Sequence, residues 1–363
     1  MSDCLVVGGG LVGMLTARAL VERGFSVRLI ERGELGREAS WAGGGILSPL
    51  YPWRYSEAVT RLARYGQAYY PDLARRLYEE TAVDSEWIPS GLLILDDTAQ
   101  AAAWAARHGV ELEMLDAQGV VRCEPALKAA AAAPAAWLPG VAQMRNPRLV
   151  RALRESLVGY GIAVETHNPV RGLLQGNGRI EGVETEQGVH RAEYVVLAGG
   201  AWNAVLLGDT RCALDVRPIR GQMLVLRGAP GVLRRIVLHR DHYLIPRADG
   251  RIVVGSTLED VGFDKSTTAQ AKEELLAAAS ALVPELAGWP VERQWAGLRP
   301  GSPQGVPVID EHPRIKGLYV NAGHYRNGVV MGLASARLCA DLVAGKPAIF
   351  ERGDYAFPAG VNN

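Results

Sequence analysis

The sequence predicts an α/β (α+β) protein of two domains, in which one domain is assembled from separated segments and carries the other as an insertion. Three observations predict this class. A glycine-rich turn between a buried strand and a helix lies at residues 8–13, and a similar turn lies at residues 323–328. Between them, residues 215–257 contain β-type runs that are typical of an antiparallel sheet. The length of 363 residues also suits two hydrophobic cores better than one.

The first 31 residues are typical of a βαβ unit. Residues 5–7 form a short apolar run of the kind found in fully buried strands, and residues 8–10 are glycines that interrupt it. Apolar residues recur at helical spacing over 11–23, and residues 25–30 predict a second strand that ends at Glu31.

The middle of the chain predicts mixed structure. Residues 33–50 are rich in glycine and serine, which indicates backbone that lies against a large flat group. Residues 51–57 mix aromatic and polar side chains and are typical of a surface lid. We expect helices over 58–80 and 147–159, a strand over 88–95, and a surface helix or irregular segment over 126–137.

The second half of the chain predicts a return to nucleotide-binding structure. A buried strand over 194–198 ends in paired glycines, a helix is expected over 270–283, and residues 318–343 read as strand, glycine loop and helix. We therefore expect residues 1–85, 141–210 and 297–363 to form a discontinuous Rossmann-like domain. Residues 86–140 and 211–296 are expected to form the inserted substrate-binding domain, with a mixed or antiparallel sheet.

Composition excludes several classes of partner. Lys plus Arg equal Asp plus Glu at 39 each, so no global charge attracts nucleic acid or an anionic membrane. No apolar run approaches the length of a membrane span, and acidic Asp3 precedes the first apolar run, which is unlike a signal peptide. The four cysteines form no C-x-x-C pair and no cluster has zinc spacing, so we expect a cytoplasmic protein without a metal site.

The turn at residues 8–13 has the spacing of a dinucleotide-binding fingerprint. Gly8 allows the tight turn, Gly10 lets a pyrophosphate approach the backbone, and Gly13 lets the helix pack closely on the strand. Glu31 is placed to accept hydrogen bonds from the adenosine ribose, and an acid at this position disfavours NADP even with Arg32 beside it.

The second glycine turn favours FAD over NAD. A helix that starts near Gly328 would direct its positive end at the edge of an isoalloxazine ring that gains negative charge on reduction. Gly44, Gly45 and Ile46 are expected along the opposite edge. A nicotinamide enzyme has no need of this arrangement.

Together these motifs resemble the family of FAD-dependent amine oxidases that includes D-amino-acid oxidase, sarcosine oxidase and glycine oxidase, over essentially the whole chain. The most specific segments are 295–300 (WAGLRP) and 323–328 (GHYRNG), and the resemblance is strongest to bacterial glycine oxidases of thiamine biosynthesis. It implies a hydroxybenzoate-hydroxylase-like architecture and noncovalent FAD, since no cysteine lies near 299–328. The residues expected to contact FAD are Gly8, Gly10, Leu11, Val12, Gly13, Glu31, Arg32, Ala39, Ser40, Gly44, Gly45, Ile46, Val170, Gly199, Trp202, Gly323, His324, Tyr325, Arg326, Asn327, Gly328, Val329 and Val330.

The substrate is expected to be a small amino acid whose carboxylate needs a cationic partner in a dry pocket. Arg299 matches the family's carboxylate-binding position, and Tyr243 is a candidate second donor that is equally compatible with a core position. Arg326 is expected either to bind substrate or to contact the flavin through its backbone. Ile46 and Leu258 are candidates for an apolar wall that limits the size of the substrate.

The resemblance implies oxidative deamination of glycine, sarcosine and small D-amino acids by hydride transfer to flavin N5. Oxygen reoxidises the flavin, and the products are an imine or 2-oxo acid, ammonia and hydrogen peroxide. Two alternatives remain open at this point: a dehydrogenase that passes electrons to a quinone or protein, and a flavin-binding scaffold without turnover. Relatives suggest a homo-oligomer.

Overall fold

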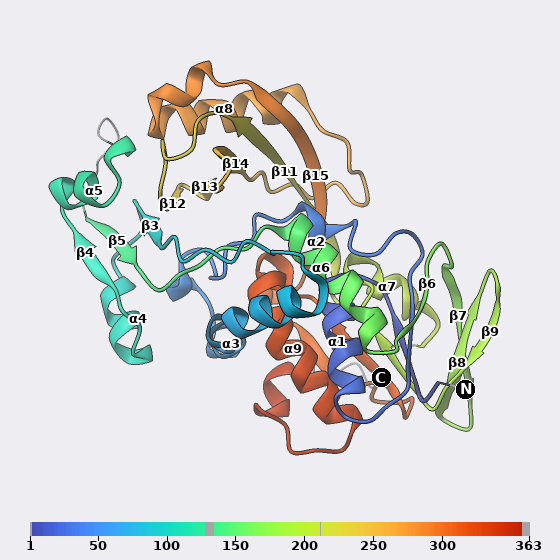
Figure 1. The fold of residues 1–363 in the computed structure, drawn as a ribbon. Coiled ribbons are helices and arrows are strands. Elements are labelled where there is room, and N and C mark those ends of the chain that lie inside the picture. The colour runs from blue at the N-terminus through green and yellow to red at the C-terminus, as the bar shows by residue number, and fades with distance from the viewer. Residues whose placement is uncertain (1, 128–133, 211, 358–363) are drawn as a thin grey trace.

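The computed structural model describes residues 2–127, 134–210 and 212–357. Two parts are visible in Figure 1: a parallel sheet covered by helices, and a large mixed sheet that carries α8 at the top of the view. The chain passes between the two parts several times, so each part is assembled from segments that are far apart in the sequence.

The parallel sheet has the strand order β16-β17-β10-β1-β2-β6, and only β16 runs antiparallel to its neighbour. All four residues of β1 are buried, as expected for a strand covered on both faces. Because β10 and β2 flank β1 on opposite sides, the carboxyl end of β1 lies at a topological switch point, where such sheets bind ligands. The strands are β1 Cys4–Val7, β2 Val27–Ile30, β6 Ala163–Glu165, β10 Tyr194–Leu197, β16 Val308–Glu311 and β17 Leu318–Ala322.

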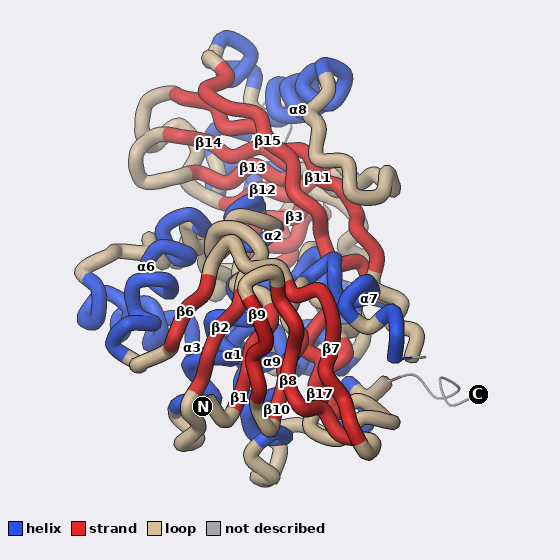
Figure 2. Tube along the Cα trace, turned by 90° about the vertical axis from the view of Figure 1, so that its right-hand side faces the viewer, coloured by secondary structure: helices blue, strands red, loops and turns tan. Residues whose placement is uncertain are grey.

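Helices cover one face of the parallel sheet and a three-stranded sheet lies on the other (Figure 2). Side chains alternate along β1 accordingly: Cys4 and Val6 pack among the helices, whereas Leu5 and Val7 pack with residues of the small sheet. The helices on the first face are α1 Leu11–Val21, α3 Glu57–Thr81, α6 Asn146–Gly159 and α9 Gly328–Val343, and the small sheet consists of β7 Val170–Gly176, β8 Arg179–Thr185 and β9 Gly188–Arg191.

The mixed sheet has the order β15-β11-β14-β13-β12-β3-β5-β4, with β12 and β3 parallel and the other pairs antiparallel. Leu224 and Leu244 pack beneath α8, Ala269–Leu282, while Met223 and Tyr243 point to the opposite face. Its strands are β3 Leu92–Ile94, β4 Glu113–Leu115, β5 Ala135–Leu138, β11 Arg217–Arg227, β12 Ile236–His239, β13 His242–Pro246, β14 Arg251–Gly255 and β15 Val291–Gly301.

Short helical elements connect the sheets. The α-helical ones are α2 Ala39–Ala42, α4 Ala101–His108, α5 Ala117–Cys123 and α7 Asn203–Leu206. Single 3-10 turns occupy Pro52–Arg54, Pro125–Leu127, Gly200–Trp202, Gly208–Thr210, Pro284–Gly288, Pro303–Gly305, Tyr325–Asn327 and Arg352–Tyr355.

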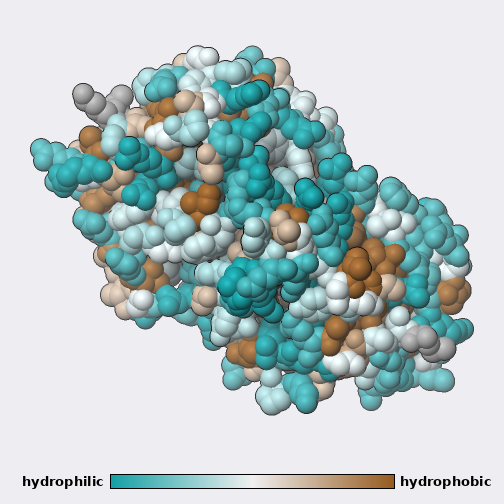
Figure 3. Space-filling view, in the orientation of Figure 1, coloured by the Kyte–Doolittle hydropathy of each residue, from teal (hydrophilic) through white to brown (hydrophobic). Residues whose placement is uncertain are grey.

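The large apolar side chains gather in four buried clusters. The surface seen in Figure 3 is accordingly mostly hydrophilic, with hydrophobic residues in separate small patches. Within the described part of the chain, every helix is too short or too polar to cross a bilayer.

The predicted α/β class is confirmed. The strands of the parallel sheet come from residues 4–30, 163–197 and 308–322, and those of the mixed sheet come from 92–138 and 217–301. β15 runs through residue 297, where a domain boundary was expected, so strand pairing continues across that point. The division into domains stays a prediction.

Three local expectations need comment. Residues 51–57 do not form a surface lid: Tyr51 and Trp53 are buried, and the Tyr51 hydroxyl donates to Asp96 Oδ1 at 2.7 Å. The strand expected over 88–95 is shorter because Gly91 has φ +68°, which ends the extended run before β3. Part of the alanine-rich run over 126–137 lies outside the described residues, and its last residues begin β5.

Acid should destabilise the fold through two buried histidines. Burial lowers the pKa of His312 and of His324 to about 4, from an ordinary value of 6.5. Between pH 6.5 and 4 the unfolded chain therefore binds protons that the folded chain does not, so stability is lost as the pH falls through this window. The melting temperature should drop between pH 7.5 and 5.

A His312→Asn variant isolates one of these groups, because asparagine does not titrate in this range. His312 Nδ1 accepts the backbone N–H groups of Arg314 and Ile315 at 3.2 and 3.1 Å, a role that an amide oxygen can also take. We expect a smaller pH-dependent drop in the variant than in the parent protein. Equal drops would contradict this assignment.

Candidate functional site

A cavity of about 370 Å³ lies between the parallel sheet and the mixed sheet. Val7, Ile30, Ala198 and Ala322, at the carboxyl ends of four parallel strands, line one side of it. Residues 221, 223, 243 and 297–300 of the mixed sheet line the other side. Segments 36–44, 169–171, 199–206 and 321–329 contribute most of the remaining wall.

The turn from β1 to α1 forms a narrow cradle at the switch point. A Cβ atom on Gly8, which has φ +111°, would lie 2.5 Å from the carbonyl oxygen of Ala198. A Cβ atom on Gly13 would lie 1.9 Å from the carbonyl oxygen of Gly8, so this position also excludes a side chain. Gly10 precedes α1 without a side-chain cap of its own, and Ser40 Oγ accepts only the Leu11 N–H at 2.8 Å, so the next N–H groups of the first turn are available to an anion.

Glu31 lies beside this cradle. Its two carboxylate oxygens accept the backbone N–H groups of Gly9 at 2.6 Å and Gly33 at 2.9 Å. Each oxygen keeps a further lone pair, and Glu31 lines the cavity, so it can also accept ribose hydroxyls. Nearby, the guanidinium of Arg32 stacks on Trp202 at 3.5 Å from the ring centroid.

A second uncapped helix starts at the same cavity. Gly328 and Val329 open α9 and line the cavity, and the preceding Asn327 makes no side-chain cap. Asn327 Nδ2 is buried and has no hydrogen-bond partner among the described residues. Two helix N-termini from opposite ends of the sequence, with this unsatisfied donor, fit a bound dinucleotide that carries negative charge.

His324 also lines the cavity and is buried. Its Nε2 lies 2.7 Å from the hydroxyl of Ser335, which in turn donates to Asn321 Oδ1. Burial lowers the pKa of His324 to about 4, so the imidazole is neutral near pH 7.

Arg299 is held by three oxygen acceptors, none of which is charged. Nη2 donates to Ser256 Oγ at 2.6 Å, and Nη1 donates to the carbonyls of Arg220 at 3.3 Å and Thr257 at 3.2 Å. Among the described residues, no carboxylate forms an ion pair with Arg299. Burial lowers its pKa, and the positive charge of Arg326 lowers it further. The remaining N–H groups on Nε and Nη2 form the edge that can meet a carboxylate bidentately.

Tyr243 and Arg326 stand near this guanidinium. Tyr243 is buried, and its hydroxyl donates to Met223 Sδ at 3.7 Å, a weak acceptor, while the same side chain hydrogen-bonds with Arg299. Arg326 does have an acidic partner, Asp241, at 3.5 Å. The arrangement therefore places one paired and one unpaired cation at the same cavity.

Most of the residues expected from the sequence meet at this cavity. Its lining includes Gly8, Gly10, Leu11, Val12, Glu31, Arg32, Ala39, Ser40, Gly44, Val170, Gly199, Trp202, Tyr243, Arg299, His324, Tyr325, Arg326, Gly328 and Val329.

Other expected residues lie behind the lining or away from it. Gly13, Gly45, Gly323, Asn327 and Val330 belong to the same turns without lining the cavity.

The structure does not bring Ile46 and Leu258 to the cavity. Ile46 pairs with Gln143 and packs in the core beneath the mixed sheet, and Leu258 is 55% exposed. Met223 and Gly221, which the sequence analysis did not select, line the wall instead. A glycine inside the long strand β11 is a signal of close approach, because a Cβ on Gly221 would lie 2.1 Å from Arg299 Nη1.

Known proteins resemble this chain over nearly its whole length. The DAO family model, described as FAD dependent oxidoreductase, matches residues 3–342. A glycine oxidase of Pseudomonas aeruginosa is 48% identical over 98% of each chain. A bifunctional protein ThiO/ThiG of Nostoc is 32% identical over 94% of this chain and 52% of its own length. The crystal structure of glycine oxidase from Geobacillus kaustophilus matches with a TM-score of 0.92 at 31% identity, covering 99% of this chain and 98% of that one.

Replacing Gly13 with alanine should impair retention of FAD, because the new Cβ would collide with the Gly8 carbonyl and displace the turn. We expect the ratio of FAD to protein, measured from absorbance after purification, to fall well below that of the parent. Gly159→Ala is the matched control, since nothing lies within 4 Å of its Cβ position. Full FAD content in Gly13→Ala would argue against the cradle.

Proposed function

The chain belongs to the DAO family of FAD-dependent oxidoreductases, and from this premise we propose that it oxidises glycine and other small primary or secondary amines, such as sarcosine and small D-amino acids. The products are the imine or 2-oxo acid, ammonia and hydrogen peroxide. The single observation that carries the proposal is the unpaired guanidinium of Arg299 in the cavity wall.

FAD is the cofactor, and the chain offers a complete set of groups to hold it. The cradle at Gly8 and Gly10 and the start of α1 suit the pyrophosphate, Glu31 suits the ribose, and the start of α9 suits the flavin. Noncovalent binding is supported by the cysteines, none of which lines the cavity in the described chain. When bound, FAD would supply the acceptor for the hydride of the amine α-carbon and would pass the two electrons on to oxygen.

Arg299 binds the carboxylate of the substrate. A buried cation without a counter-ion is costly, and an anionic ligand that forms two charge-assisted hydrogen bonds removes that cost. The hydroxyl of Tyr243 is free to donate to the same carboxylate, because its thioether partner accepts only weakly. Together they orient the amino acid within the cavity.

The charges around Arg299 also act on the amine. Arg299 and Arg326 are both cationic, so they disfavour a protonated ammonium group nearby and favour the neutral amine. The neutral amine has the lone pair that assists departure of hydride. The neighbouring side chains then contribute position and electrostatics, and no general base is required of them.

The size of the substrate is limited by side chains on the same wall of the cavity as Arg299. Met223 and Tyr243 line the cavity there, and Gly44 lies so close that its Cβ would be 2.6 Å from Ile245 Cδ1. This close packing supports a preference for small side chains. The role of Ile46 and Leu258 in limiting size stays a prediction.

We place the reaction in thiamine biosynthesis, supported by the ThiO/ThiG names of three relatives. The chain spans about half of those relatives' length. Assembly as a homo-oligomer and a cytoplasmic location remain predictions.

An anaerobic titration of the purified yellow protein tests the proposal. Glycine, sarcosine, D-alanine and D-proline should each bleach the flavin absorbance, with glycine or sarcosine effective at the lowest concentration. Admitting oxygen should restore the colour and yield one peroxide per turnover. Bleaching that only an artificial acceptor reverses would mean a dehydrogenase, and absence of bleaching by any amine would refute the proposal.

Arg299→Ala should raise the KM for glycine roughly 100-fold, since breaking a buried charge pair costs about 3 kcal/mol. Arg299→Lys should recover only part of this loss, because lysine lacks the bidentate fork. Steady-state kinetics under peroxide detection measure both effects. An unchanged KM in Arg299→Ala would move carboxylate binding to Arg326.

A further inference from the structure

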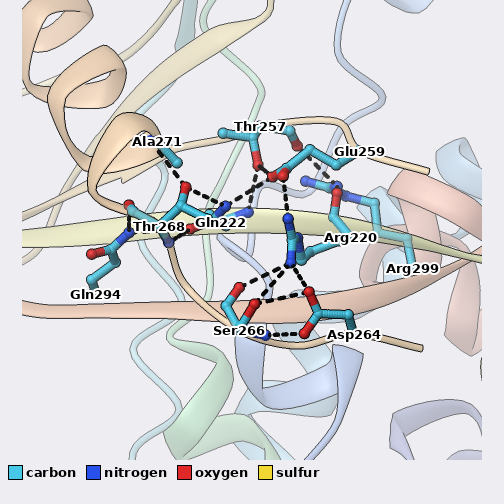
Figure 4. A network of polar contacts seen from close by, with 10 residues as sticks. All are labelled: Arg220, Gln222, Thr257, Glu259, Asp264, Ser266, Thr268, Ala271, Gln294 and Arg299. Carbon is cyan, nitrogen blue, oxygen red and sulfur yellow. Dashed lines mark hydrogen bonds and ion pairs between the residues drawn. The ribbon is translucent and has the colours of Figure 1, made fainter. Parts of the chain in front are cut away.

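A network of polar contacts leads from the mixed sheet to Arg299 (Figure 4). It joins β11 to residues 256–268, the segment that connects β14 to α8. We propose that Arg220, together with Ser256, is a positioning residue that orients the guanidinium of Arg299 for the substrate carboxylate. This inference rests on the proposed function.

The side chain of Arg220 fastens the connecting segment to β11. Arg220 is only 5% exposed, and its guanidinium reaches Glu259 and Asp264 at 2.5 Å each. Nη1 also donates to the carbonyl and the hydroxyl of Ser266, both at 3.2 Å. One buried cation therefore ties together three residues of a segment whose residues 258–268 are otherwise largely exposed.

The backbone at the same place reinforces this attachment. Arg220 N donates to the carbonyl of Glu259 at 2.8 Å, and Glu259 N donates to the carbonyl of Arg220 at 3.0 Å. The hydroxyl of Thr257 accepts the backbone N–H of Gln222 at 2.9 Å and donates to Glu259. Residues 256–259 are thus held at a defined distance from β11.

The acceptors that hold Arg299 belong to the parts that Arg220 joins. Two of them, Ser256 Oγ and the carbonyl of Thr257, lie on the connecting segment, and the third is the carbonyl of Arg220 itself. Since no carboxylate of the described chain pairs with Arg299, these three uncharged oxygens, together with the Tyr243 hydroxyl beside them, set its orientation. Gly221, against which the guanidinium lies, offers no side chain to guide it.

Displacing the connecting segment should therefore loosen the guanidinium without removing it. A bidentate contact depends on the angle of the fork, so the loss should fall on carboxylate recognition. A merely structural role of Arg220 would reduce activity on all amines alike.

The test compares glycine with glycine ethyl ester, which keeps the amine but has no carboxylate. We expect Ser256→Ala and Arg220→Met to lower the ratio of kcat/KM for glycine to that for the ester about tenfold, through KM, with kcat on the ester little changed. The dissociation constant of acetate, measured on the FAD-loaded protein from the shift of its flavin spectrum, should rise by a similar factor. Arg220→Lys should restore part of the ratio.

Arg251→Met is the matched control. Arg251 lies in the neighbouring strand β14 and also pairs with two carboxylates, Asp249 at 2.7 Å and Glu292 at 2.9 Å. Unlike Arg220, it holds no acceptor of Arg299. The Arg251→Met variant should have the same ratio of kcat/KM for glycine to kcat/KM for the ester as the parent, and the same dissociation constant for acetate. A fall in the ratio equal to that of Arg220→Met would overturn the proposal.

Two further outcomes distinguish a failure of the positioning role from a failure of carboxylate binding by Arg299. If Arg299→Ala collapses the ratio while folded Ser256→Ala and Arg220→Met leave it unchanged, the positioning role is wrong and the proposed function stands. If Arg299→Ala leaves the ratio unchanged, carboxylate binding by Arg299 is itself wrong. Should Arg220→Met fail to fold, Ser256→Ala alone decides, because it removes one hydroxyl at a single contact.

Discussion

Burying the guanidinium of Arg299 costs free energy that no carboxylate of the described chain offsets. The structure tolerates this cation by surrounding it with oriented dipoles from β11 and residues 256–257. If the proposed carboxylate binds there, substrate recognition and local stability are linked, because the anion supplies the counter-ion that Arg299 lacks. The second cation at the cavity, Arg326, is already paired with Asp241. Arg299 is therefore the one of these two arginines that lacks a counter-ion among the described residues.

The same logic applies at the cofactor half of the cavity. The N-cap residues of α1 and α9 make no side-chain cap, and in α1 only the Leu11 N–H is taken by a side chain, Ser40 Oγ at 2.8 Å. Glycines at positions 8 and 13 bring the backbone together so closely that side chains are excluded. These features lower the stability of the protein without FAD, and binding of FAD compensates for this loss.

The sequence predicted the fold and much of the cavity because their signals are local. Strand, glycine turn and helix follow one another over residues 4–21, and the acid at Glu31 ends the next strand. The family model confirms the expected family and FAD, and Arg299, predicted from the motif at 295–300, lines the cavity. Gly221 and Ser256 were missed because their importance depends on pairing between β11 and β15 and on a connection folded back over them. Tyr51 and Trp53 looked like surface residues because aromatic content alone does not reveal the sheet that covers them.

The position of β17 and α9 has a consequence for biosynthesis. β17 is an interior strand that pairs with β10, and α9 packs against α1, yet both are translated long after β1, β10 and α1. A ribosome-bound chain that has emerged only through residue 300 can therefore already pair β1 with β2 and β10. The edge of β10 that pairs with β17 is still free, and the apolar side of α1 that packs against α9 is still exposed. Such a nascent chain offers the kind of edge and apolar surface that holding chaperones recognise. Completion of the cofactor cavity and concealment of these surfaces therefore become one event, which requires the residues of β17 and α9.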